Sequence, residues 1–310
     1  MKKVFIDGSA GTTGLRIYER LRQREDIVLL LLDEASRKDE AARRRALNDA
    51  DIVFLCLPDE AAKEAVSWIE NEDTVVLDTS TAHRTASGWT YGFPELSKEL
   101  AEAVISAKRI AVPGCHASGF IALVYPLIEA GVLSNDALLT SHSVTGYSGG
   151  GKKMIAAYTA EESDLLYQAP RQYALGQTHK HLKEMCAHTG LCKFPVFSPI
   201  VSDFYSGMCV TVPLFTEQLT NGCTVEDLHN IYKKKYQGPI VAYTEDFSQD
   251  GFLSAAALSG KDSMRISLYG NEQRIVLTAL YDNLGKGASG AAIECMNYVL
   301  GMDPTQGLDL

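Results

Sequence analysis

Positive charge, long apolar runs and regularly spaced cysteines are all scarce in this 310-residue sequence. Lys and Arg total 29 against 39 Asp and Glu, so the net charge is −10. A polyanion such as DNA would be repelled by that average charge, and we therefore expect no nucleic-acid partner. The densest basic run, residues 43–45, lies beside Glu40 and Asp49 and is typical of a solvated helix face.

The most apolar long window, residues 119–133, contains Pro126, Glu129 and Gly131. It falls short of the roughly 20 apolar residues that span a bilayer, so we expect no membrane partner. The N-terminus carries only a short apolar run before glycines, unlike a signal peptide. The seven cysteines are odd in number and irregular in spacing, so they do not indicate a disulfide framework. These features favour a protein of the reducing cytoplasm.

The length and the 46% hydrophobic content predict two globular domains. Short apolar runs at residues 4–6, 27–32, 51–56, 74–78 and 109–112 alternate with helix-length segments, a pattern that predicts a parallel, doubly wound sheet. After about residue 115 come longer alternating runs at 138–145, 208–215 and 265–280, with turn signals at 221–222 and 270–271. These indicate a mixed or antiparallel sheet, and residues 288–301 return to a helical pattern. We expect an α/β protein with a Rossmann-type parallel-sheet domain and an α+β catalytic domain.

A glycine-rich loop directly follows the first predicted strand. Glycines at such a strand-to-helix turn let the backbone approach a pyrophosphate, and the helix start offers N–H groups to it. The spacing is GxxGxxG rather than GxGxxG, so a plain turn is the alternative interpretation. The candidate cofactor-binding residues of this loop are Gly8, Ser9, Gly11, Thr12, Thr13 and Gly14.

The choice of cofactor depends on the segment about 20 residues past that loop. Asp33 is suited to a ribose 2′-hydroxyl, as in NAD enzymes, whereas Ser36, Arg37 and Lys38 are suited to the 2′-phosphate of NADP. The two interpretations exclude each other, because a carboxylate would repel the phosphate. We favour NADP, with Ser36 and Arg37 as the contacts, although an exposed Arg-Lys pair is commonly just solvated.

Cys115 is the candidate nucleophile. A predicted strand, a Pro-Gly turn and a helix-compatible segment at 116–128 converge on it, which places its sulfur at a helix N-terminus. The helix dipole there favours the thiolate, the form that attacks an activated acyl group. The general alternative for a cysteine, a small buried apolar side chain, fits Cys56, Cys209 and Cys295 better.

The histidine partner is expected in the segment that begins at Thr178, which resembles a helix N-cap. His179 and His181 both flank the apolar stripe of this helix, and we choose His179 as the general acid and base. Zinc binding by His179, His181, Cys186, His188 and Cys192 is a weaker alternative, because the spacing of known zinc sites is absent. The other histidines lack a distinguishing context, except that His116 adjoins the cysteine.

The chain resembles the shorter form of the N-acetyl-γ-glutamyl-phosphate reductases, within the aspartate-semialdehyde dehydrogenase superfamily. The resemblance runs nearly end to end. His116 and His83 stand where the longer form has an aromatic residue and a phenylalanine, and Lys183 replaces a usual proline. The segments that carry it are the loop 8–14, Asp78-Thr79-Ser80-Thr81-Ala82-His83-Arg84, Tyr91-Gly92-Phe93-Pro94-Glu95-Leu96, Pro113-Gly114-Cys115, His179-Lys180-His181-Leu182-Lys183-Glu184 and Asp282-Asn283-Leu284-Gly285-Lys286-Gly287-Ala288-Ser289-Gly290.

This resemblance implies a nucleotide-binding domain of residues 1–115 and 286–310 and a catalytic and oligomerisation domain of residues 116–285. It implies NADP(H), a homo-oligomer (dimer or tetramer) and reduction of N-acetyl-γ-glutamyl phosphate to the 5-semialdehyde through a thioester on Cys115. Arg84 is the first candidate for the substrate phosphate, and His181 and Glu184 are carried over as substrate contacts. Ser148 and Lys152 are candidates from a glycine-rich turn, and Gly287 would admit the nicotinamide.

Two other functions remain open at this point. Aspartate-semialdehyde dehydrogenase performs the same chemistry on a free amino acid, and a non-catalytic NADP-binding regulator would keep the fold without turnover. The sequence does not fix the subunit number, the full set of phosphate ligands or whether a substrate one carbon longer is accepted.

Overall fold

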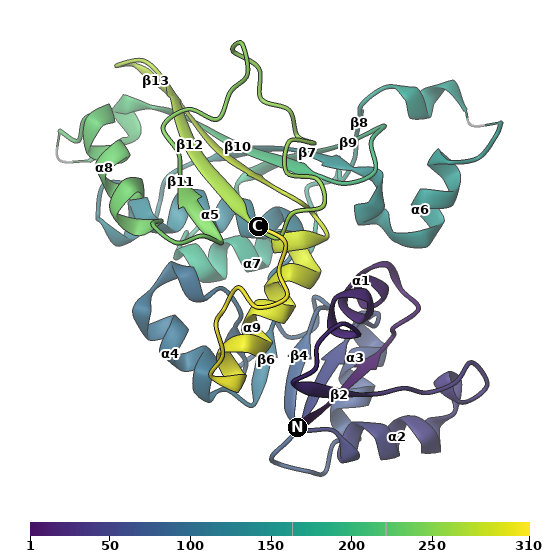
Figure 1. Cartoon of the computed structure of the whole chain (residues 1–310). Helices are drawn as coiled ribbons and strands as arrows, with labels where there is room; N and C mark the ends of the chain where they lie inside the picture. Colours follow the sequence, from purple (N-terminus) through teal and green to yellow (C-terminus); the bar gives the residue numbers. More distant parts are fainter. Residues whose placement is uncertain (163, 221) are drawn as a thin grey trace. The chain divides into compact units, whose positions relative to one another are not determined.

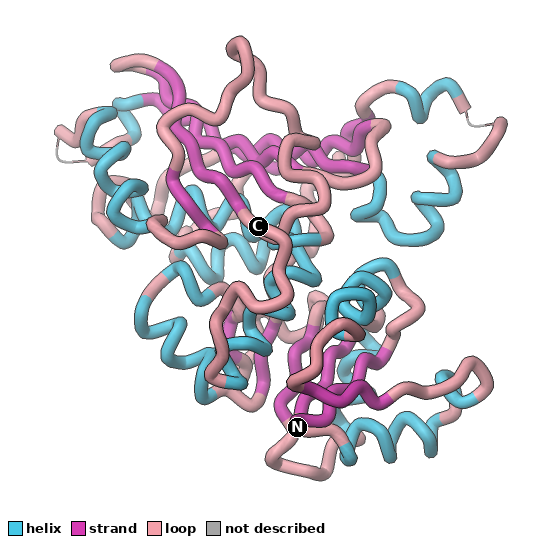
Figure 2. Tube along the Cα trace, viewed as in Figure 1, coloured by secondary structure: helices cyan, strands magenta, loops and turns pink. Residues whose placement is uncertain are grey.

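The computed structural model describes residues 1–162, 164–220 and 222–310, and the chain divides into two compact units. Unit 1 contains residues 1–114 and 288–308, and unit 2 contains residues 115–287 and 309–310. The strands of each unit gather into one sheet (Figure 2).

Unit 1 is built on a parallel sheet of strand order β2-β1-β3-β4-β6-β5. The strand order reverses at β1, which pairs with both β2 and β3, and such switch points bind ligands at the carboxyl ends of the strands. The strands are β1 (Lys2–Asp7), β2 (Ile27–Leu30), β3 (Ile52–Leu55), β4 (Val75–Asp78), β5 (Thr90–Tyr91) and β6 (Arg109–Ala111). The helices are α1 (Thr12–Leu21), η1 (Ser36–Lys38), α2 (Glu40–Asp49), α3 (Asp59–Ser67), η2 (Pro94–Leu96), α4 (Lys98–Ser106) and α9 (Gly290–Leu300).

Both faces of this sheet are covered, which explains the continuous apolar runs of its strands. In β3, Ile52 and Phe54 pack with residues of α1, α4 and α9, while Val53 and Leu55 pack with residues of α2 and α3. Unit 1 is thus a three-layer α/β structure (Figure 1). The prediction of a Rossmann-type parallel sheet is confirmed.

Two glycines shape the turn from β1 into α1. Gly8 has a φ of +88°, and a Cβ there would lie 2.3 Å from the Cys56 carbonyl oxygen. A Cβ on Gly14 would lie 2.4 Å from the carbonyl oxygen of Gly8, so any side chain would push α1 away from the strand. Both glycines are therefore required for the close packing of the turn that leads from β1 into the start of α1.

Unit 2 is built on a mixed sheet of strand order β11-β12-β13-β10-β7-β9-β8, as expected from its alternating runs. Its strands are β7 (Thr140–Gly146), β8 (Arg171–Gln172), β9 (Val196–Ser202), β10 (Met208–Phe215), β11 (Val241–Tyr243), β12 (Met264–Gly270) and β13 (Arg274–Tyr281). Its helical segments are α5 (Cys115–Glu129), η3 (Tyr147–Gly150), α6 (Gly151–Tyr158), η4 (Leu165–Gln168), α7 (His181–Thr189), η5 (Thr216–Gln218), α8 (Val225–Lys235) and the π-helical turn η6 (Gly285–Ser289).

Helix α5 packs on β10 and β13 and against α7 and α8. Pro126 lies inside α5 and has no N–H for the carbonyl of Ala122. A tyrosine supplies this donor instead, since the Tyr236 hydroxyl donates to the Ala122 oxygen at 2.8 Å, and the Tyr232 hydroxyl donates to the neighbouring Leu123 oxygen. This apolar helix therefore keeps its backbone satisfied across the proline.

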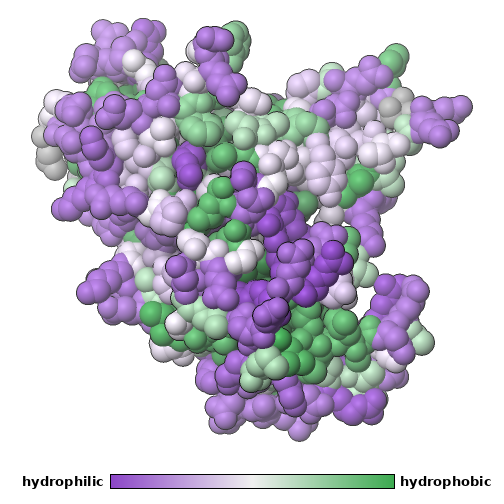
Figure 3. Space-filling view, viewed as in Figure 1, coloured by the Kyte–Doolittle hydropathy of each residue, from purple (hydrophilic) through white to green (hydrophobic). Residues whose placement is uncertain are grey.

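The predicted turn at 270–271 joins β12 to β13. In the other predicted turn, Asn221 lies outside the described residues, and Gly222 has a φ of +65°. Among the helices of the described residues, none is long and apolar enough to cross a membrane. The visible surface is mostly hydrophilic with apolar patches (Figure 3), and the exposed apolar residues of unit 1 include Leu15, Val28 and Leu31.

Candidate active site

Cys115 is the first residue of α5 and is partly exposed. Its carbonyl oxygen accepts a hydrogen bond from the Tyr281 hydroxyl, which in turn accepts the N–H of Gly119 at 3.1 Å. A Cβ built on Gly287 would lie 3.1 Å from the Cβ of Cys115, so the turn η6 lies directly against the cysteine. The backbone that carries the sulfur is thus held by Tyr281 of β13. On its other side lies Gly287, which has no side chain.

His179 lies before helix α7, which begins at His181 and has Lys180 as its N-cap. The prediction of Thr178 as the N-cap, with His179 in the first turn, is therefore wrong. The physical reason is that His179 Nδ1 accepts the backbone N–H of His181 at 3.2 Å and so caps the helix in place of a hydroxyl. A neutral ring that accepts at Nδ1 carries its proton on Nε2, which makes Nε2 a donor.

His116 joins these histidines from the neighbouring helix. Its ring centroid lies 5.7 Å from that of His179 and 5.7 Å from that of His181, and the latter two rings are 4.6 Å apart. His116 Nδ1 is 2.6 Å from Ser143 Oγ, and its Nε2 is 2.6 Å from the Tyr173 hydroxyl. Burial, with a smaller contribution from the charge of His179, lowers the pKa of His116 to about 3, so this ring is neutral.

The two tyrosines near Cys115 keep their protons. Burial raises the pKa of Tyr173, and the negative charge of the Cys115 thiolate raises it further. The pKa of Tyr281 is raised for the same two reasons, with an added contribution from Glu184. Both hydroxyls are therefore neutral in the electrostatic field of the cysteine.

Asp282 and Asn283, at the end of β13, hold the turns of this part of unit 2. The carboxylate of Asp282 accepts the N–H groups of Leu284 and Gly285 at 2.6 and 3.1 Å, which fixes the start of η6. Asn283 Nδ2 donates to Ser148 Oγ at 3.0 Å. The η6 turn and the segment with Ser148 are thus attached to one strand end.

The other predicted substrate residues of unit 2 differ in their surroundings. His181 and Glu184 are both buried on α7. Ser148 is buried in η3, whereas Lys152 is exposed in the first turn of α6. The glycine-rich stretch 148–152 is therefore helical rather than an open loop tip.

In unit 1, Ser36 and Arg37, the predicted contacts of the NADP 2′-phosphate, lie beyond β2 in the exposed turn η1. The N–H of Ser36 donates to Asp33 Oδ1 at 2.7 Å, and hydrogen bonds from Ser36 lower the pKa of Asp33. Arg37 forms an exposed ion pair with Glu34 at 2.8 Å. The Asp33 carboxylate thus binds its own turn, and the turn presents Arg37 at its surface.

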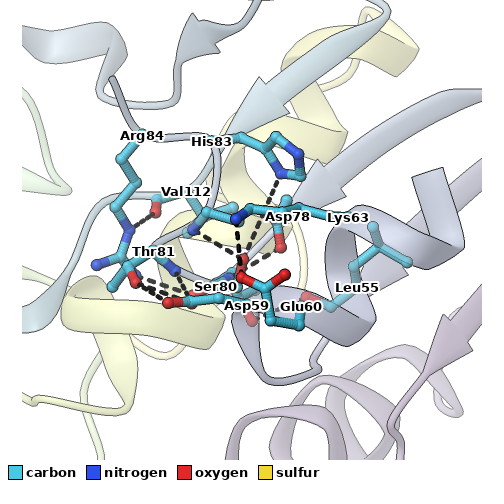
Figure 4. Close-up of polar contacts among 12 residues, drawn as sticks. Leu55, Asp59, Glu60, Lys63, Asp78, Ser80, Thr81, His83, Arg84 and Val112 are labelled. Atoms are coloured by element: carbon cyan, nitrogen blue, oxygen red, sulfur yellow. Dashed lines mark hydrogen bonds and ion pairs between the residues drawn. The ribbon is translucent and has the colours of Figure 1, made fainter. Parts of the chain in front are cut away.

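Arg84 and its neighbours form a buried polar group at the end of β4 (Figure 4). Asp78 accepts from Ser80 Oγ at 2.7 Å and from His83 Nδ1 at 2.6 Å. Arg84 Nε donates to the carbonyl oxygen of Val112 at 2.9 Å, three residues before Cys115 in the chain. Its guanidinium thus fixes the backbone that leads to the cysteine.

The structure brings several predicted residues of unit 2 together and adds others. Cys115 lies against Gly287, and His179 lies beside His181. The sequence reasoning missed Ser143, Tyr173 and Tyr281 and gave His116 no role beyond its position. The one available signal was that His116 follows the cysteine. Among the described residues, no group of three His, Cys, Asp or Glu side chains is placed to hold a metal ion.

Residues 3–104 match the model described as the semialdehyde dehydrogenase NAD-binding domain, and residues 115–283 match the semialdehyde dehydrogenase dimerisation domain. A Nostoc sp. protein named N-acetyl-gamma-glutamyl-phosphate reductase 2 is 42% identical, over 99% of this chain and 99% of that protein. A Rhizobium etli protein named N-acetyl-gamma-glutamyl-phosphate reductase is 44% identical, over 96% of this chain and 98% of its own. This chain belongs to the N-acetyl-gamma-glutamyl-phosphate reductase family. Members of this family are oxidoreductases, and their match confirms the resemblance stated from the sequence.

Solved structures support the fold of this reductase family member. Aspartate semialdehyde dehydrogenase II from Vibrio cholerae, in complex with ASA, superposes with a TM-score of 0.72 at 16% identity, over 97% of this chain and 98% of that chain. The aspartate semialdehyde dehydrogenase of Francisella tularensis gives 0.72 at 13% identity, over 97% and 100%. At such identities the likeness concerns the fold alone.

Proposed function

We propose that this chain reduces N-acetyl-γ-glutamyl phosphate to N-acetylglutamate 5-semialdehyde with release of phosphate, a step of arginine biosynthesis. Its relatives are 42% and 44% identical over nearly their full length and carry the name of that reductase. The single observation that carries the proposal is the placement of Cys115 at the start of α5, beside Gly287 and directly before His116, whose ring lies 5.7 Å from those of His179 and His181.

In this proposal Cys115 is the nucleophile. Its sulfur attacks the γ-carbonyl carbon, the C–S bond forms, and the bond to phosphate breaks to leave a thioester. The helix dipole at the start of α5 favours the thiolate needed for this attack. His179 is the general acid and base, because a ring that accepts at Nδ1 carries on Nε2 a proton that it can transfer to the oxygen of the thiohemiacetal that follows. When the C–S bond breaks, the aldehyde leaves and the thiolate returns.

We propose NADP(H) as the cofactor, bound by the loop at 8–14 and by Ser36 and Arg37. When bound, a nicotinamide dinucleotide supplies the hydride for the thioester carbon. The proposal is supported by the tight glycine turn that leads from β1 directly into the start of α1, because the N–H groups of a helix start bind phosphates. Replacing Arg37 with Ala tests the preference: the KM for NADPH should rise about tenfold while that for NADH stays unchanged, as for loss of a phosphate contact. An equal effect on both cofactors would contradict this role.

We propose that Arg84, His181, Glu184, Ser148 and Lys152 contact the substrate. Ser148 is supported by its hydrogen bond with Asn283, which attaches it to the strand end that also holds η6. Lys152 supplies an exposed positive charge next to this segment. Arg84 contributes a buried guanidinium. Each of these side chains can offer the acyl phosphate substrate a charge or a hydrogen bond.

We propose residues 1–115 and 286–310 as the nucleotide-binding domain and residues 116–285 as the catalytic and oligomerisation domain, in a cytoplasmic homo-oligomer. The matched domain of residues 115–283 bears the description of a dimerisation domain. One face of the unit 2 sheet exposes apolar side chains, including Val196 at 57% and Phe215 at 58% exposure. Sedimentation of the variant Phe215→Glu tests the interface, and an unchanged assembly size would contradict it. The free thiols of the seven cysteines suit a reducing compartment.

The test of the activity measures phosphate-dependent NADP+ reduction with N-acetylglutamate 5-semialdehyde. The Cys115→Ser variant should lose activity at least about a thousandfold while binding the nucleotide normally. The matched control, Cys192→Ser, removes an exposed thiol and should behave as the unaltered protein. Full activity of the Cys115→Ser variant would contradict the thioester mechanism. If the unaltered protein prefers aspartate semialdehyde, the proposed substrate is wrong. If it binds the nucleotide without any turnover, it is a regulator.

The two histidines are compared in single-turnover reactions. His179→Asn should slow acylation more than His181→Asn, because only His179 lies outside the helix with its Nε2 as a donor. The reverse order would transfer the acid and base role to His181.

A further inference from the structure

We propose that His116 is a positioning residue that holds the Tyr173 hydroxyl as a hydrogen-bond donor toward the reacting group on Cys115. The inference rests on the proposed function and adds a donor for the oxyanion of that reaction. It stands on three side chains in a row: Ser143 Oγ, the His116 ring and the Tyr173 hydroxyl, joined by contacts of 2.6 Å on each ring nitrogen.

The direction of these two hydrogen bonds follows from counting hydrogens. A neutral imidazole has one N–H and one acceptor nitrogen, and each hydroxyl brings one hydrogen. Two contacts use two of the three hydrogens, so either the Ser143 hydrogen or the Tyr173 hydrogen is left over. The position of the remaining hydrogen decides whether the row ends in the core or at the cysteine.

Ser143 is the wrong place for an unused hydrogen. It is 0% exposed in β7, and His116 is the hydrogen-bond partner of its Oγ within the described part of the chain. A buried donor left unsatisfied is costly, whereas Tyr173 is partly exposed and its hydrogen can meet a ligand. Ser143 therefore donates to Nδ1, Nε2–H donates to the oxygen of Tyr173, and the Tyr173 hydrogen remains for a third group.

The surroundings of Tyr173 identify that third group. Tyr173 is hydrogen-bonded to His116, which is the residue after Cys115. The ring centroid of Tyr173 lies 6.2 Å from that of His179. Burial raises the pKa of Tyr173, and the negative charge of the Cys115 thiolate raises it further, so Tyr173 lies in the electrostatic field of that sulfur. The charged and titratable groups that face His116 are His179 and His181 from the α7 segment, Tyr173 from the segment after β8, and Cys115 from its own helix. Among these described groups, Cys115 is the one that carries negative charge in its reactive form, so a hydrogen directed toward it stabilises the thiolate or an oxyanion bonded to it.

The backbone near Tyr173 is fixed, which a positioned donor requires. The N–H of Tyr173 donates to the carbonyl of Pro199 in β9 at 3.0 Å. Four residues on, the Gln177 side chain makes two hydrogen bonds of 2.8 Å with the backbone of Phe197. Ala174 and Gln177 have φ values of +52° and +53°, a conformation that costs non-glycine residues energy and that these attachments maintain.

The experiment compares Tyr173→Phe, His116→Phe and the double variant. Tyr173→Phe should lower kcat about a hundredfold with a change in KM below about threefold, as expected for loss of one oxyanion donor. His116→Phe keeps an aromatic ring and should lower kcat about tenfold. The double variant should be no slower than Tyr173→Phe alone, because His116 acts through Tyr173. The control Tyr167→Phe, which removes a hydroxyl from η4, should leave kcat unchanged.

Two results would overturn the proposal: a kcat for Tyr173→Phe within about twofold of the unaltered protein, or losses of the single variants that multiply in the double variant. A second measurement is independent of the substrate. Alkylation of Cys115 by iodoacetamide at pH 7, followed on its peptide by mass spectrometry, should slow severalfold in Tyr173→Phe because the thiolate loses a donor. An unchanged alkylation rate contradicts the inference even if the proposed substrate is wrong, and a slowed rate in a protein without that activity would refute only the substrate.

Discussion

Gly287 provides a direct test of how closely η6 must approach the cysteine. An alanine there places its Cβ 3.1 Å from the Cβ of Cys115 and 3.0 Å from the carbonyl oxygen of Asp282. Ordinary carbon contacts begin near 3.4 Å, so the turn or the helix start must move by a few tenths of an ångström. Neither is free to do so: Tyr281 holds the carbonyl of Cys115, and the carbonyl of Asp282 accepts the N–H groups of Gly285 and Gly287.

Overpacking of this kind costs about 1–3 kcal/mol, and part of that strain would be relieved by displacing the sulfur. A displacement of about 1 Å can lower a rate about a hundredfold, so a shift of a few tenths should lower kcat about tenfold. The assay measures kcat and the alkylation rate of Cys115 for Gly287→Ala.

The matched control is Gly238→Ala, whose Cβ would meet the Val241 oxygen at 3.7 Å, an ordinary contact, without a positive φ. We expect this control to keep the kcat of the unaltered protein and a similar stability. If Gly287→Ala also keeps kcat within about twofold, η6 does not set the position of the sulfur and the reasoning is refuted.

Two further predictions concern stability. Tyr236→Phe leaves the buried Ala122 carbonyl opposite Pro126 without its donor, so urea unfolding should show a loss of about 1–3 kcal/mol, and an unchanged free energy of unfolding would argue against that hydrogen bond. For His116, the folded pKa of about 3 lies below the ordinary 6.5, so the unfolded chain binds the extra proton and stability falls as the pH drops below about 6.5. Between pH 6.5 and 5 the free energy of unfolding of the unaltered protein should fall by about 2 kcal/mol from this group, and that of His116→Phe should not. If the two proteins lose stability equally as the pH falls, the ring is not buried and neutral.

The parts of the fold that depend on local sequence could be predicted. The strands of unit 1 are buried on both faces, so each is a short apolar run between helices. A strand end, a Pro-Gly turn and a helix-compatible segment within a few residues predicted that Cys115 lies at a helix start. In the structure α5 begins at Cys115. These signals need no knowledge of distant partners.

The parts that depend on distant partners could not be predicted. His116 finds Ser143 and Tyr173 at separations of 27 and 57 residues, through a sheet pairing that local patterns do not encode. The start of α7 was placed too early, because Thr178 has the residue type of an N-cap while the ring of His179 performs the capping. The short strand β8 is defined only by its pairing with β9.

The cap on α7 links proton transfer to backbone order. The nitrogen of His179 that receives the His181 N–H has one lone pair in the ring plane, so a doubly protonated imidazole must release that amide. In the acid-base role proposed for His179, each protonation of the ring would therefore loosen the first turn of α7, and each return to the neutral ring would close it again. Amide hydrogen exchange at His181 would then rise and fall with the protonation of the His179 ring, so the main chain would report the state of the proposed acid and base.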